Sequence, residues 1–151
     1  MTRWTRGEAD IERMLASGEL QRVRGEAADG GGWLEKATTT LTSAEGLKVD
    51  DPNSAYTLAY DAARFACAGL LAQQGLRATT SGGHYAVQQA MIRQFGPTFE
   101  PYSTMRRRRN ELEYPEFPDE IVETAEADHA VTAARSLIEA AEKLRSHLGL
   151  F

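Results

Sequence analysis

The sequence is poor in the features that mark several large classes of protein. It has a single cysteine, Cys67, among its 151 residues, so no disulfide can form within the chain. No stretch approaches the roughly 20 consecutive apolar residues that a membrane-spanning helix requires. Residues 1–8 lead into no apolar segment of the kind found in signal peptides. We therefore expect a cytoplasmic protein with no membrane association.

Motifs for cofactors and metals are also scarce. The glycine clusters at 30–32 and 82–83 match neither the G-x-x-x-x-G-K loop nor a G-x-G-x-x-G turn after a strand. His129 and His147 have no partners at metal-ligand spacing, and Cys67 lies among alanines, where a small thiol packs as a core residue. We predict no cofactor and no metal site.

Positive charge is concentrated in one segment of an acidic chain. The net charge is -5, which argues against a protein that coats nucleic acid in general. Four consecutive arginines, Arg106 to Arg109, nevertheless stand before a run of acidic residues that reaches Asp128. Four successive helical positions point in nearly all directions, so some of these arginines face solvent and at least one faces the bundle. A guanidinium on that side needs a carboxylate or phosphate partner.

Helical periodicity dominates the chain, and no window shows the sustained alternation typical of strands. Glycines and prolines divide it into helices over about 8–23, 33–46, 51–74, 85–95, 101–112 and 118–148. Asp51 is expected to cap the third helix, Gly75 to end it, and Pro118 to lie in the first turn of the last. The predicted fold class is all-α, an antiparallel bundle of four to five main helices.

The helices are expected to form a single domain over residues 1–151. Residues 1–28 would be an N-terminal helical extension and residues 29–151 the core bundle. The alanine-rich segment 55–74 would be the central helix, because small side chains let neighbouring helices approach closely. Its Tyr56 and Tyr60 lie one turn apart. We expect their side chains either to pack in the core or at a dimer interface, or to line a site beside the arginines.

Three segments in this order resemble the HEPN superfamily of nucleotide-binding and ribonuclease domains. They are the alanine-rich helix AYTLAYDAARFACAGLLAQQGLR, the segment SGGHYAVQQAM and the signature RRRRNELEYP. The likeness covers about residues 33–148. It implies a HEPN-like bundle and, in active members, a metal-independent ribonuclease site made of an Arg and a His four to six residues apart, usually across a homodimer.

This sequence departs from that pattern at the histidine. Arg109 matches the arginine and Asn110 the polar residue that follows it, but Tyr114 occupies the histidine position. A phenol titrates near pH 10 and is a poor general base, although it can donate a hydrogen bond to a phosphate. No residue is assigned a catalytic role with certainty; a ribonuclease would use Arg109 and Tyr114. The predicted ligand-binding residues are Arg106, Arg109, Asn110, Tyr114 and His84, the last at the start of a helix whose free amides attract anions.

Three functions remain open from the sequence. The first is a non-catalytic module that binds a nucleotide, RNA phosphate or a partner in a bacterial toxin-antitoxin or defence system. The resemblance adds a homodimer and a nucleotidyltransferase or antitoxin partner to this prediction. The second is a divergent metal-independent ribonuclease toxin, in which Tyr114, His84 or a residue from a second protomer replaces the missing histidine. The third is a structural helical adaptor whose arginines are only a charged surface.

Overall fold

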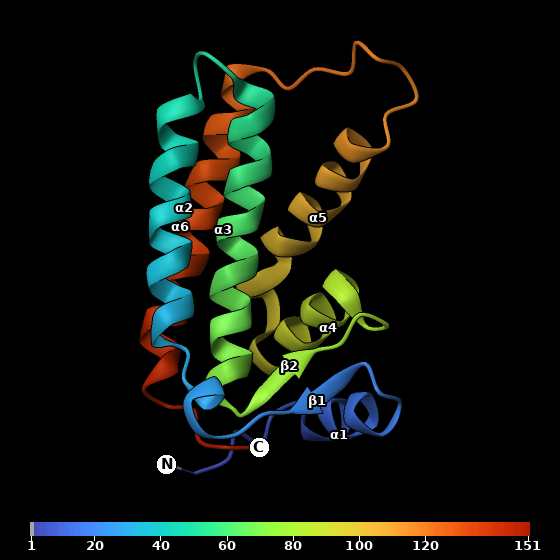
Figure 1. Cartoon of the computed structure of the whole chain (residues 1–151), viewed down its shortest axis with the longest axis vertical. Coiled ribbons are helices and arrows are strands. Elements are labelled where there is room, and N and C mark those ends of the chain that lie inside the picture. Colours follow the sequence, from blue (N-terminus) through green and yellow to red (C-terminus); the bar gives the residue numbers. More distant parts are fainter. Residues whose placement is uncertain (1) are drawn as a thin grey trace.

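Three long helices pack side by side in the computed structural model, which describes residues 2–151 (Figure 1). They are α2 (Gly31–Leu47), α3 (Pro52–Gln73) and α6 (Thr124–Arg145). Helix α3 contacts both of the others. Ala59, Ala63 and Ala66 of this helix are fully buried, and their small size lets the helix axes approach closely. The predicted all-α bundle is confirmed.

The ends of α3 follow the signals in the sequence. Asp51 caps the helix, because its side chain accepts a hydrogen bond of 3.2 Å from the amide of Ser54. At the other end Gly75 adopts a φ of 70°, a left-handed conformation that costs a glycine little. The chain there turns out of the helix and into a short strand.

The residues between the short strand and the last helix form a second layer. It consists of α4 (Gly83–Phe95), the short 3₁₀ helix η2 (Gly96–Phe99) and α5 (Glu100–Glu113). The first turns of α5 are anchored by Tyr102 and Met105, which are buried against the bundle. Beyond them α5 diverges from α3, as Figure 1 shows. Arg106 to Arg109 therefore lie where α5 leaves the core.

The prediction for residues 8–23 was wrong in its second half. Helix α1 covers only Glu8–Ala16, and Gly18 then takes a φ of 80°, which ends the helix. Strand β1 (Leu20–Arg22) follows and pairs antiparallel with β2 (Leu76–Ala78), so that Gln21 lies opposite Arg77. A three-residue strand is too short to show alternation in the sequence, because its pairing comes from a segment more than 50 residues away. The 3₁₀ helix η1 (Gly25–Ala28) then leads into α2.

The last helix begins later than the pattern predicted. It starts at Thr124, so Pro118 does not lie in its first turn, and Asp119 and Glu120 are not at its positive end. Residues 114–123 form an irregular segment that is held by side chains of other elements. The side chain of Asn53 accepts a hydrogen bond of 2.9 Å from the amide of Val122, whose own side chain is buried. These tertiary contacts fix an irregular backbone over residues 118–123, where the sequence alone favours helix.

Residues 2–151 include no helix that combines the length and the apolar character needed to cross a membrane.

Candidate functional site

A chain of hydrogen bonds links the buried core to the start of α4. The Tyr60 hydroxyl lies 2.8 Å from Nδ1 of His84 and 3.1 Å from the hydroxyl of Tyr102. Tyr60 and Tyr102 are completely buried and come from α3 and α5, whereas His84 is exposed as the second residue of α4. One polar network therefore joins three helices and ends on an imidazole at the surface.

Three arginines surround this network. Arg64 of α3 and Arg106 and Arg109 of α5 all act electrostatically on both Tyr60 and His84. The Nε of Arg106 donates a hydrogen bond of 2.6 Å to the side chain of Gln88, and its guanidinium lies 5.4 Å from the ring centre of Tyr85. Two residues of α4 thus position Arg106 without neutralising it. We use the name arginine cleft for the group of Arg64, His84, Arg106 and Arg109, of which Arg64 and His84 line one recess and Arg109 another.

The carboxylates near the arginine cleft neutralise it only in part. Arg109 forms an ion pair with Glu113 one turn later on α5. Arg64 lies 3.8 Å from the Asp61 carboxylate, which is too far for a hydrogen bond. Its Nε is buried and has no hydrogen-bond partner. A buried donor without a partner is costly, so the cleft carries both positive charge and unused hydrogen-bonding capacity toward an anion.

The environment keeps the titratable groups of the network uncharged. Burial, and then the positive charge of Arg64 and Arg109, lowers the pKa of His84 below its usual 6.5. Burial raises the pKa of Tyr60 and, more strongly, that of Tyr102. At neutral pH the imidazole is therefore neutral and both phenols keep their protons. When Tyr102 donates to Tyr60 and Tyr60 donates to Nδ1, the ring proton of His84 is on Nε2, where it serves as a donor to a ligand.

Arg108 has a structural role that the sequence did not single out. Its guanidinium bonds to Glu126 and Glu120, each with a shortest distance of 2.6 Å, and to Glu111 at 3.1 Å. These carboxylates, from α5, α6 and the segment between them, raise the pKa of Arg108. Arg108 is therefore an inward-facing arginine of the kind that the helix geometry predicted. Its partners are carboxylates of the same chain and not a phosphate. Arg107, by contrast, is exposed.

Of the predicted ligand-binding residues, the structure brings together His84, Arg106 and Arg109. Asn110 and Tyr114 lie at the diverging end of α5, where both are exposed and Tyr114 reaches 73% exposure. α5 ends at Glu113, and the amide of Tyr114 donates to the backbone carbonyl of Asn110. Within residues 2–151, neither side chain makes a hydrogen bond to the network around His84.

Sequence reasoning missed Arg64, Gln88 and Tyr102. A signal for all three was present in the spacing, because Tyr60 and Arg64 are four residues apart, as are His84 and Gln88 and also Tyr102 and Arg106, and such pairs share one helix face. The contact between the Tyr102 and Tyr60 hydroxyls had no local signal, since only the packing of α5 against α3 brings them together.

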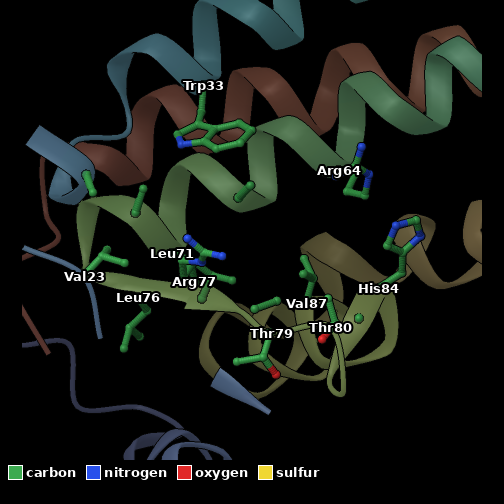
Figure 2. A pocket seen from close by; sticks show the side chains of 15 residues that line it. Val23, Trp33, Arg64, Leu71, Leu76, Arg77, Thr79, Thr80, His84 and Val87 are labelled. Carbon is green, nitrogen blue, oxygen red and sulfur yellow. The ribbon is translucent and has the colours of Figure 1, made fainter. Parts of the chain in front are cut away.

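Arg64 and His84 also line a pocket of about 620 Å³ (Figure 2). It lies between α2, α3, β2 and α4, and Arg64 and His84 approach each other at one end of it. Its remaining walls are mainly apolar. Among the described residues, no cluster of His, Cys, Asp and Glu is arranged to hold a metal ion.

No family model matches the sequence, and comparison with curated proteins and with solved structures found no match.

Proposed function

We propose that this chain is a cytoplasmic binding module for phosphate-bearing ligands, with RNA or a nucleotide held at the arginine cleft. The supporting observation is that the positive charges of Arg64, Arg106 and Arg109, from two different helices, all act on His84 in a chain whose net charge is -5. Local positive charge in an acidic protein favours a specific anion over general nucleic-acid binding.

The chemistry of each group suits a phosphate. Guanidinium groups form charge-assisted hydrogen bonds with phosphate oxygens, and Arg64 has a buried Nε without a partner. The neutral His84 offers one further donor at Nε2 when Tyr60 occupies Nδ1. Four donors from three helices define a site for one or two phosphate groups.

The HEPN resemblance extends this proposal to a biological setting. It supports a homodimer and a nucleotidyltransferase or antitoxin partner in a bacterial toxin-antitoxin or defence system. A dimer would place two arginine clefts in one particle and strengthen binding to a polyanion through multivalency.

A second candidate function is metal-independent cleavage of RNA. The observation that favours it is the position of His84, which has arginines around it and a buried tyrosine to orient its ring. In the tautomer with the proton on Nδ1, the lone pair of Nε2 would act as a general base. We rank this function second because it requires the less favoured direction of the hydrogen bond: a phenol is a stronger acid than a neutral imidazole and therefore the better donor between them.

The first experiment measures binding of a fluorescent single-stranded RNA by anisotropy, and its integrity on a gel with and without a chelator. Arg106→Ala and Arg109→Ala are each expected to weaken binding by about 1–2 kcal/mol, or roughly 5- to 30-fold. Arg107→Ala is the matched control, since Arg107 is exposed on the same helix and outside the cleft.

The outcomes separate the three functions. Intact RNA, with binding lost in the two cleft variants and kept in the control, supports the binding module. Cleavage that resists chelation and disappears in His84→Gln would instead establish the ribonuclease. Equal RNA binding by all variants, or none by the wild-type protein, would contradict the RNA proposal and favour the helical adaptor.

A further inference from the structure

The pocket beside the arginine cleft differs from the cleft in chemistry. Nine of its lining residues are apolar, among them Trp33, Leu71, Leu76 and Val87. Its volume of about 620 Å³ lies in the range of small-molecule sites. An open apolar recess of this size has room for an organic body larger than a phosphate group.

The charged groups at the pocket all have the same sign. Arg64 and Arg77 line it together with His84, and none of its lining residues is acidic. Figure 2 shows Arg77 beneath the indole of Trp33, and Arg64 beside His84. The carboxylate nearest to Arg64 is that of Asp61, at 3.8 Å, and the Nε of Arg64 is left buried without a partner. This end of the pocket lacks an acceptor that an anionic head group would supply.

The polar groups of the walls are few and partly occupied. The hydroxyl of Thr79 already donates to the backbone carbonyl of Gly18 at 2.5 Å. A nucleobase carries several donors and acceptors on its edge, and burying them without partners would weaken its binding. The walls therefore favour an alkyl or aryl body over a base.

We infer that this pocket is a second binding site, for a small organic anion with an apolar body and one carboxylate or phosphate head group paired with Arg64. The body lies along Trp33 and Ala68, and the head group pairs with the guanidinium of Arg64, whose side chain is 28% exposed. Because Arg64 also belongs to the arginine cleft, a bound anion lowers the positive charge available to RNA there.

The test uses calorimetry on the full chain with three probes that share one ring system: 2-naphthoate, 2-naphthyl phosphate and the uncharged 2-naphthamide. At least one anion is expected to bind saturably and at least about tenfold more tightly than the amide. The stronger of the two anions identifies the head group. Equal binding of the amide and both anions, or no saturable binding by either anion, would overturn the inference.

Two variants locate the site. Arg64→Gln is expected to abolish the preference for the anions over the amide. Arg64→Lys keeps the positive charge but not the planar guanidinium, and is expected to retain part of that preference. Ala68→Leu fills the recess and is expected to reduce anion binding at least about tenfold. The control is Ala140→Leu, a partly buried alanine on α6 outside the pocket.

The RNA assay separates this site from the proposed function. Ala68→Leu is expected to bind RNA as the wild-type protein does, because Arg106 and Arg109 lie outside the pocket. If RNA and naphthoate binding fell together in Ala68→Leu while its thermal unfolding midpoint stayed unchanged, the two ligands would share one site and the inference would fail. If naphthoate bound and RNA did not, the second site would stand without the first.

Discussion

The hydroxyl of Tyr60 lies 2.8 Å from Nδ1 of His84, so a fully buried residue of α3 is bonded directly to an exposed residue at the start of α4. This contact fixes the orientation of an imidazole on which the charges of three arginines converge. The same Tyr60 hydroxyl is the hydrogen-bond partner of the buried Tyr102 hydroxyl. The Tyr60 hydroxyl therefore contributes both to the stability of the fold and to the orientation of the His84 ring.

Tyr60→Phe is expected to lower the free energy of unfolding by about 1–3 kcal/mol, because it leaves the buried Tyr102 hydroxyl without a partner. Urea denaturation followed by circular dichroism measures the change. The control is Tyr85→Phe, which removes a hydroxyl that is 54% exposed and should alter stability by less than about 0.5 kcal/mol. Equal small effects would show that the network contributes little to the fold.

Binding of RNA is expected to tighten as the pH falls below neutrality. The pKa of His84 is lowered in the free protein, and the negative charge of a bound phosphodiester raises it. The complex therefore takes up a proton, so affinity rises as pH decreases through the pKa of the complex and levels off below that of the free protein. A phosphodiester probe does not itself titrate in this range. Dissociation constants between about pH 5 and 8 measure the effect.

The control for this pH dependence is His84→Gln, which cannot take up the proton. Its affinity should change much less with pH than that of the wild-type protein. Identical slopes in the two proteins would place the titrating group elsewhere and remove His84 from the site.

Arg108→Ala is expected to destabilise the fold modestly and to leave RNA binding by the folded protein unchanged. The substitution leaves the carboxylates of Glu111, Glu120 and Glu126 without their shared cation, and because these carboxylates are screened by solvent we expect a loss of about 1 kcal/mol in the free energy of unfolding. Thermal and urea unfolding, compared with Arg107→Ala, provide the measurement. A larger loss of RNA binding than in Arg106→Ala would show that Arg108 contacts the ligand.

Gly30→Ala tests the close approach of the start of α2 to α3. A Cβ at Gly30 would lie 2.2 Å from the backbone carbonyl oxygen of Gly69, so one helix must shift, at a cost of roughly 1–3 kcal/mol. Gly32→Ala, two residues later, places its Cβ in open space and should stabilise the helix by up to about 1 kcal/mol. Opposite signs in thermal unfolding confirm the packing, and equal effects contradict it.

The sequence predicted the core helices well because their signals are local. The cap at Asp51, the left-handed turn at Gly75 and the buried alanine face of α3 each depend on residues within a few positions of one another. The predictions failed at β1 and at residues 118–123. In both places the backbone is held by partners distant in the chain, namely β2 for the strand and Asn53 for the irregular segment.

The residues of the candidate site were likewise predicted from the sequence only where the signal is local. Composition and order alone identified a local basic segment on a helix and a histidine at the start of another, because residue type and spacing are properties of the sequence. Only the tertiary structure decided the role of each arginine. Arg108 forms hydrogen bonds with the carboxylates of Glu120 and Glu126. The charges of Arg106 and Arg109, together with that of Arg64, act on His84. That choice depends on the angle at which α5 leaves the bundle, which is set by the burial of Tyr102 and Met105 against helices far away in the chain.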